Sequence, residues 1–101
     1  MFVISVMYPP SSRFDLSYYL EKHIPLVRSR WTALGLRNVS VLRGKSGATG
    51  DAPTHPVIAL LNFDRLEDFQ SAVQQHGKEV MGDIPNFTDA QPVLQINESV
   101  A

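Results

Sequence analysis

A tyrosine and a histidine four residues apart, Tyr19 and His23, are the most informative feature of the sequence. Side chains at this spacing lie one above the other on the same face of a helix. Histidine changes charge near neutral pH, so it can take up or release a proton there. A neighbouring phenol can orient the imidazole or donate a proton to a bound molecule. The pair therefore predicts a catalytic acid–base site. The alternatives are a helix histidine with one satisfied hydrogen bond and a tyrosine that only packs in the core.

A second set of candidate residues lies in the segment 83–89, which combines two carboxylates, an amide and an aromatic ring. Asp83 is predicted to pair with His23, where it would hold one tautomer of the imidazole and stabilise its cation. Asp83, Asn86 and Phe87 are also predicted to bind substrate, with the Phe87 ring covering an apolar ligand. Turn geometry alone also produces loops of this composition, so the sequence leaves both interpretations open.

Two further aromatic residues are predicted to line the same site. Tyr8 ends the first predicted strand just before Pro9, where its phenol could line the mouth of a pocket. Trp31 lies on the apolar face of the first predicted helix and would form a pocket wall if the pocket lies between helix and sheet. Core packing is the alternative for both rings. Tyr18 is offset by one residue from Tyr19 and is expected to point elsewhere.

Metal, thiol and serine chemistry are not expected from this sequence. His23, His55 and His76 show no close ligand spacing, and the chain contains no cysteine. No Gly-x-Ser-x-Gly motif supports a serine nucleophile. The Gly-Lys-Ser tripeptide at 44–46 lacks the first glycine of a phosphate-binding loop, since Val39 stands at that position. We therefore expect no metal and no organic cofactor.

The candidate residues must be positioned by the first of two predicted helices. This helix begins after its N-cap Asp15 and runs to Leu34, with Gly35 as its C-cap. Pro25 lies inside it, removes one backbone hydrogen bond and is expected to bend the axis just before it. The buried face is expected to carry Leu16, Tyr19, Leu20, His23, Val27 and Trp31.

The remaining elements are predicted from apolar runs and turn-forming residues. Strands are expected at 2–8, 36–43, 57–63 and 92–97, with a flexible glycine-rich loop at 44–56. Asp64 is expected to cap a second helix at 65–76, with Gly77 closing it. Its core stripe is expected to hold Leu66, Phe69 and Val73 and to extend to His76. A short extra turn at 78–81 and the loop at 83–89 would follow.

The order of these elements predicts a ferredoxin-like βαββαβ fold of the α+β class, with two helices on one face of a four-stranded antiparallel sheet. The strands are apolar on both faces: Ala59 and Leu61 alternate with Ile58 and Leu60. Both sides of a strand are apolar only when both are covered. One layer of helices covers one face, so we predict a homodimer packed through its sheet faces. Scattered apolar residues on a wet face are the alternative.

Length and composition place residues 1–101 in a single domain. The net charge is -1 and the 9 Lys and Arg residues form no basic stripe, so a nucleic-acid partner is not expected. The sequence opens without the features of a signal peptide, and no apolar run approaches the ~20 residues that span a bilayer. With no cysteine present, these features predict a cytoplasmic protein without a membrane segment.

The residues that carry these predictions also resemble a known family. Tyr8-Pro9, Phe14-Asp15, Tyr18-Tyr19, His23-Ile24-Pro25-Leu26, Gly35-Leu36 and Asp83-Ile84-Pro85-Asn86-Phe87-Thr88-Asp89 are similar to the motifs of the EthD family. That family is named for a protein encoded with an ether-degrading oxygenase system. The resemblance runs from Met1 to Asn97. It implies a dimeric α+β barrel of two ferredoxin-like subunits, with His23 as the acid–base residue and Asp83 and Phe87 in the second motif.

The residues and the resemblance together predict a small-molecule enzyme that needs no metal or organic cofactor. His23 would act as general acid or base on an apolar or aromatic metabolite, in an isomerisation, a dehydration or a decarboxylation. Two alternatives stay open. One is a non-catalytic accessory or ligand-carrier protein of an oxygenase-linked degradation pathway, and the other is a cofactor-free monooxygenase.

Overall fold

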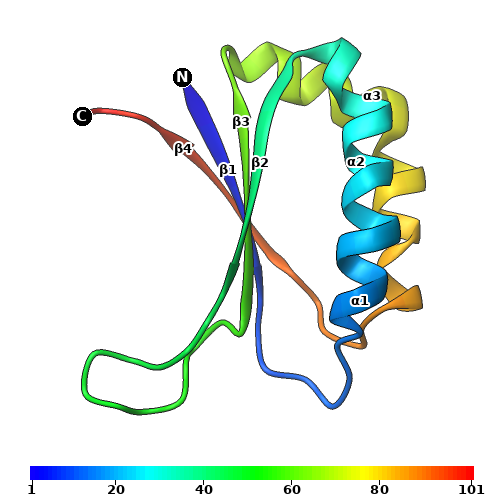
Figure 1. The fold of residues 1–101 in the computed structure, drawn as a ribbon. Coiled ribbons are helices and arrows are strands. Elements are labelled where there is room, and N and C mark those ends of the chain that lie inside the picture. Colours follow the sequence, from blue (N-terminus) through cyan, green and yellow to red (C-terminus); the bar gives the residue numbers. More distant parts are fainter.

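Four antiparallel strands form one sheet, and all helices lie on one of its faces (Figure 1). The computed structural model describes all residues, 1–101. The strands are β1 (Phe2–Tyr8), β2 (Leu36–Arg43), β3 (Val57–Phe63) and β4 (Val93–Glu98), in the spatial order β2-β3-β1-β4. The predicted ferredoxin-like fold is confirmed, and only β4 is shifted, by one residue, from the predicted strands.

Between β1 and β2 the chain is helical, as predicted. It forms α1 (Leu16–Tyr18), a π-helical turn (Tyr19–His23), α2 (Ile24–Trp31) and a 3-10 turn (Thr32–Leu34). The predicted N-cap is confirmed, because the Asp15 carboxylate accepts a hydrogen bond of 3.0 Å from the Tyr18 N–H. Gly35 is the predicted C-cap, with a φ of 111° in the left-handed region.

The irregularity expected at Pro25 takes the form of a widened turn. Proline has no N–H to continue the helical ladder. Directly before it, the Ile24 N–H donates to the carbonyl of Tyr19, which closes a π-turn instead of an α-turn. The prediction that Leu20 lies on the buried face is wrong, since its side chain is 46% exposed. Leu20 follows Tyr19 by more than a quarter of a turn, which carries it off that face.

The second helix, α3 (Leu66–Gly82), is longer than the predicted helix at 65–76. Its backbone leaves helical geometry at His76, with φ -133° and ψ 15°, and then resumes. Gly77 was expected to close the helix, but its φ is not positive and it continues the helical path into the 78–81 turn. A glycine ends a helix only where the chain adopts the left-handed conformation.

Two predicted roles near α3 are wrong. Asp64 does not cap the helix, because its carboxylate pairs with the guanidinium of Arg37 on β2 at 2.8 Å, and Arg65 stands at the N-cap without a side-chain hydrogen bond. In the predicted core stripe Phe69 is buried, but Val73 is 42% exposed. Val73 lies where the helix and the sheet separate, at the edge of the cavity described below.

The strand register places alternate side chains on the helix-facing side of the sheet. Ile4 on β1 pairs with Leu61 on β3, and both are buried. The intervening residues of these strands, such as Met7 and its partner Ile58, face the opposite side and are only half-buried. The sheet therefore has one closed face under the helices and one apolar face without cover.

The edge strand β4 diverges from the helix layer (Figure 1). Leu94 and Ile96 share the helix-facing side with their β1 partners Val6 and Ile4. No helix covers them, so they are 42% and 50% exposed. The separation of β4 from α3 leaves an apolar opening beside the core.

The Gly35→Ala variant is expected to lower the free energy of unfolding by more than about 1 kcal/mol. An added Cβ would lie 2.8 Å from Cβ of Asp68, and the φ of 111° is strained for alanine. Urea denaturation measures the change. Gly82→Ala is the control, because its added Cβ has no atom within 4 Å and its φ is not positive. Equal losses of stability in both variants would contradict this account.

Candidate functional site

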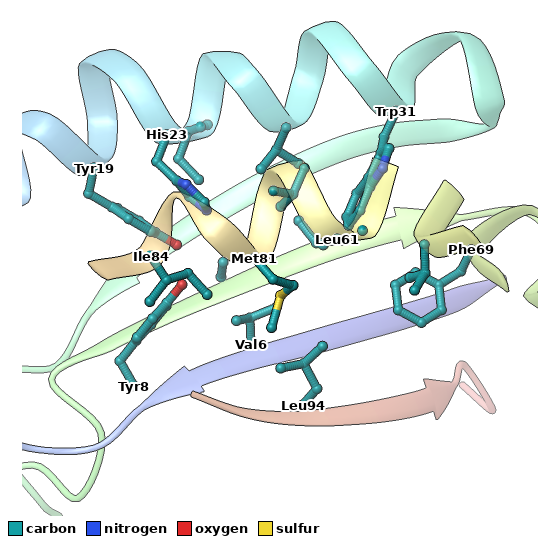
Figure 2. A pocket seen from close by; sticks show the side chains of 16 residues that line it. Val6, Tyr8, Tyr19, His23, Trp31, Leu61, Phe69, Met81, Ile84 and Leu94 are labelled. Atoms are coloured by element: carbon teal, nitrogen blue, oxygen red, sulfur yellow. The ribbon is translucent and has the colours of Figure 1, made fainter. Parts of the chain in front are cut away.

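A cavity of about 320 Å³ lies between the helices and the sheet (Figure 2). Its walls come from β1, β3, β4, the π-turn, α2 and α3. Of its 16 lining residues 14 are hydrophobic, and the other two are His23 and Gly77. No Asp, Glu, Lys or Arg side chain lines it. The cavity therefore suits an apolar molecule, with His23 as its only group that titrates near neutral pH.

The predicted pairing of His23 with Asp83 is confirmed. The imidazole Nδ1 lies 2.8 Å from Oδ2 of Asp83, although the two residues are 60 positions apart. A carboxylate only accepts hydrogen bonds, so the Nδ1 atom carries the proton in this pair. The Nε2 atom of the neutral ring is then a free acceptor, and His23 lines the cavity. This is the arrangement that a general base requires.

Asp83 is held by two further donors. The Tyr18 hydroxyl donates to Oδ1 at 2.7 Å, and the Asn86 side-chain amide donates to the same oxygen at 2.9 Å. Burial alone would raise the pKa of Asp83, but the hydrogen bonds from Tyr18, Asn86 and His23 outweigh it and lower the pKa. Asp83 is therefore a carboxylate at neutral pH and points one oxygen at the imidazole.

The protonation of His23 follows from its burial. The side chain is 3% exposed, and removal of the imidazole from water lowers its pKa below the usual 6.5. The Asp83 carboxylate raises the pKa but offsets only part of this effect. At pH 7 the ring is neutral, so it is ready to accept a proton.

Tyr8 and Tyr19 line the cavity near His23, as predicted (Figure 2). Each is 1% exposed, and their rings meet edge to face with centroids 5.7 Å apart. The Tyr19 ring also stacks on the imidazole at 5.5 Å. Burial raises the pKa of both phenols, so both hydroxyls keep their protons at neutral pH. Trp31 forms the opposite end of the cavity, and its buried Nε1 has no hydrogen-bond partner.

The other predicted binding residues lie behind the cavity wall. Asp83, Asn86 and Phe87 are not among the lining residues. Phe87 is fully buried, with its ring centroid 4.7 Å from that of His23 and 5.0 Å from that of Tyr19. It packs against the two predicted catalytic side chains from behind, and the contact of Phe87 with a ligand stays a prediction.

Sequence reasoning missed Tyr18, which was expected to point elsewhere. In an α-helix residues five apart lie on different sides, because one turn takes 3.6 residues. A π-turn closes between such residues and brings them onto nearly the same side. The π-turn at Tyr19–His23 therefore lets Tyr18 and His23 reach the same carboxylate. Pro25 just after His23 is the signal that could have revealed this.

The Asp83 segment is fixed to the chain between β1 and α1. The Asp15 N–H donates to the Phe87 carbonyl at 2.7 Å, and Phe14 forms an isolated β-bridge with Thr88. The Arg13 guanidinium donates to the Pro85 carbonyl at 2.7 Å. These contacts place the segment against the helix that carries His23.

Further wall residues come from α3 and the chain after it. Met81 and Val80 of α3 line the cavity together with Ile84, and Leu94 of β4 borders it. Sequence reasoning did not assign these residues to the site. No three His, Asp or Glu side chains lie close enough to hold a metal ion, and no helix is long and apolar enough to cross a lipid bilayer.

Comparison with known proteins gives the family. No family model and no curated protein matches the chain. An EthD-like protein from Ralstonia eutropha JMP134 matches with 38% identity and a TM-score of 0.90, over 99% of this chain and 92% of that one. The chain belongs to the EthD family.

Two other solved structures are similar to this EthD protein. An ethyl tert-butyl ether d (EthD) family protein from Bacillus halodurans C-125 shares 24% identity, with a TM-score of 0.80 and 99% coverage of both chains. A dimeric ferredoxin-like protein from an uncultured marine organism shares 16% identity, with a TM-score of 0.67 over 100% of this chain and 96% of that one. These two likenesses agree with the ferredoxin-like fold.

The Asp83→Asn variant is expected to lower the pKa of His23 further. Burial of the imidazole remains, whereas the charge and the hydrogen bond that raise its pKa are removed or weakened. NMR titration of the imidazole measures the change. Asp89→Asn is the control, because Asp89 lies in the same segment but bonds Ser12 and the Arg13 N–H. A rise of the His23 pKa in Asp83→Asn would contradict the pairing argument.

Proposed function

We propose that the protein is a small-molecule enzyme in which His23 acts as general base, and then as general acid, on an apolar or aromatic metabolite. One observation carries the proposal: a buried, neutral imidazole is hydrogen-bonded to Asp83 through Nδ1 and borders an apolar cavity. The Asp83 carboxylate stabilises the imidazolium that forms when Nε2 takes a proton. Tyr19 positions the ring by stacking on it.

The chemistry in this proposal needs only proton transfer. A positioned acid–base residue contributes about 10²–10⁴-fold to a rate. Isomerisation, dehydration and decarboxylation of an activated substrate are within that range. Metal or organic cofactors have no part in the proposal, since every step uses a group of this chain.

The His23→Ala variant is expected to lose about 10²–10⁴-fold in turnover while it keeps its fold, because the variant removes the base. Substrates are first sought by thermal shift with aromatic and polyketide-like compounds, and product formation is then followed. His76→Ala is the control, since His76 lies on α3 outside the cavity. Turnover at the wild-type rate by a folded His23→Ala variant would show that His23 is not the base.

In the wild-type enzyme kcat/KM is expected to rise with pH and to level off above the pKa of His23. The free base is the active form, and burial places its pKa below 6.5. The plateau therefore includes pH 7. A kcat/KM that falls between roughly pH 5.5 and 7.5, about one unit either side of the ordinary histidine pKa, would contradict the assignment of His23 as base.

The accessory-protein alternative uses the same cavity without the proton transfer. In that case ligands bind equally to wild type and to the His23→Ala variant, and no product forms. A cofactor-free monooxygenase would instead consume oxygen when given a quinol. An oxygen electrode separates that reaction from proton transfer, which consumes none.

We also propose a homodimer that packs through the uncovered sheet face. This face carries Val3, Met7, Ile58 and Leu60. They are half-buried by neighbouring side chains of the sheet, and no helix covers them. Burial of apolar surface gives about 25 cal/mol per Å², which favours a second copy over water. The likeness to a dimeric ferredoxin-like protein supports the same arrangement.

The Leu60→Asp variant is expected to be monomeric under conditions in which the wild type is a dimer. The substitution places a charge in the centre of the proposed interface without an opposing charge. Analytical ultracentrifugation measures the mass. Leu20→Asp is the control, because Leu20 is 46% exposed on the helical side of the molecule. A monomeric wild type would overturn the dimer, and a dimeric Leu60→Asp variant would overturn its packing through the sheet face.

A further inference from the structure

We propose that the hydroxyls of Tyr8 and Tyr19 bind the oxygen of a neutral carbonyl group, so that the ligand class of this site is an apolar ketone and not a carboxylate. The proposal rests on the proposed function and names the substrate class of the same cavity. It keeps His23 as the acid–base residue, assigns hydrogen bonding of the substrate to the Tyr8 and Tyr19 hydroxyls, and narrows the proposed reactions to isomerisation and dehydration, because a decarboxylase substrate is itself a carboxylate.

The two hydroxyls form a donor pair at one end of the cavity. Both phenols line it at the His23 end, whereas Trp31 and Phe69 lie at the other end (Figure 2). Both are buried beyond the reach of bulk water, and burial keeps their pKa values raised. The two hydroxyls also bond each other, with Tyr19 donating to Tyr8, so the pair carries no negative charge and presents the Tyr8 O–H as a donor to a ligand oxygen, which the Tyr19 O–H can join when it turns from Tyr8. An oxygen atom of the ligand is the matching partner.

The charges around the pair exclude a carboxylate ligand. No Lys or Arg lines the cavity, so a carboxylate would lose its hydration without meeting a cation. His23 is the closest group that could become positive, but burial keeps it neutral at pH 7. Directly behind it lies the Asp83 carboxylate, 2.8 Å from Nδ1, which repels a second negative charge.

A ketone makes use of all three polar groups. His23 Nε2 removes a proton from the carbon next to the carbonyl, and the electron pair of that C–H bond forms a C=C bond. The carbonyl π electrons move to the oxygen, whose developing charge the two hydroxyls stabilise by hydrogen bonding. The enolate oxygen then reforms the C=O bond, and the C=C electron pair either takes the proton from the imidazolium at another carbon of a conjugated ligand or forms a new C=C bond. In the second case a hydroxyl on the neighbouring carbon leaves with its C–O bond pair and takes the imidazolium proton, as water. Atoms and electrons balance without a co-reactant.

The apolar part of the ligand fills the rest of the cavity. A volume of about 320 Å³ holds roughly ten groups the size of a water molecule. The walls between the two ends are aliphatic or aromatic, so the remainder of the ligand is a hydrocarbon or an aromatic ring system. An opening beside Val73, Met81 and Leu94, each 42–43% exposed, gives access from solvent.

Three matched naphthalenes test this proposal: 2-acetylnaphthalene, 2-naphthoic acid and 2-ethylnaphthalene. Binding at pH 8 is followed through the fluorescence of Trp31, which is the only tryptophan and lines the cavity. We expect the ketone to bind at least tenfold more tightly than the ionised acid. Equal or tighter binding of the acid, or no binding of the ketone, would overturn the proposal.

The Tyr8→Phe and Tyr19→Phe variants assign the effect to the hydroxyls. Each is expected to weaken ketone binding roughly threefold to tenfold, which corresponds to one lost hydrogen bond. Binding of 2-ethylnaphthalene is expected to stay within twofold of the wild-type value, which also shows that the cavity is intact. Equal weakening of ketone and hydrocarbon in both variants would overturn the role of the hydroxyls.

A separate readout decides the catalytic proposal. In D₂O the wild type is expected to speed the exchange of the methyl protons of 2-acetylnaphthalene, and His23→Ala is not. If the ketone binds tightly but its methyl protons do not exchange, the acid–base function is wrong and the ketone ligand class is kept. Exchange without preference for the ketone over the acid would leave the base in place and overturn the ligand class.

Discussion

The site depends on one hydrogen bond, between Nδ1 of His23 and the Asp83 carboxylate, 2.8 Å long. An imidazole that is almost fully buried has lost its water, and an unpaired buried polar group costs about 1–3 kcal/mol. The carboxylate satisfies one nitrogen and leaves the other at the cavity. Because the two residues lie 60 positions apart, the first helix and the segment after α3 must meet within the narrow distance range of a hydrogen bond.

Local structure meets this requirement from both sides. On the helix, Pro25 breaks the backbone ladder and a π-turn precedes it, so that Tyr18 and His23 reach the same carboxylate. On the other segment, Asn86 holds Asp83, and Phe87 packs between the aromatic rings of the site. Few of these residues touch the cavity, yet they decide where its only imidazole points.

Much of the fold follows from short-range patterns in the sequence. Apolar runs located the four strands, and Asp15 and Gly35 marked the ends of the first helical region. Gly77 misled because its effect depends on its φ, which the residue type does not determine. The exposure of Val73 and Leu94 arises from the divergence of β4, which is a tertiary feature without a local signal.

The residues of the candidate site were predictable where their side-chain types suit acid–base chemistry or ligand binding. Tyr8, Tyr19, His23 and Trp31 line one cavity, and Asp83 pairs with the histidine, as their types indicated. The residue types alone do not determine which residues line the cavity and which lie behind its wall. Phe87 and Asn86 carry groups suited to a ligand, but Phe87 is buried behind the cavity wall, and the Asn86 amide bonds Asp83 outside the cavity.

The π-turn has a consequence for how this protein compares with other sequences. A π-turn amounts to one residue inserted into an α-helix, and each residue rotates an α-helix by about 100°. Removal of a single residue between Tyr19 and His23 would realign the helix and swing every side chain upstream of the deletion around the axis. The placement of Tyr18 thus depends on the number of residues between it and Pro25. A relative that has the same polar residues but lacks one residue in this turn would not bring Tyr18 and His23 to the same carboxylate.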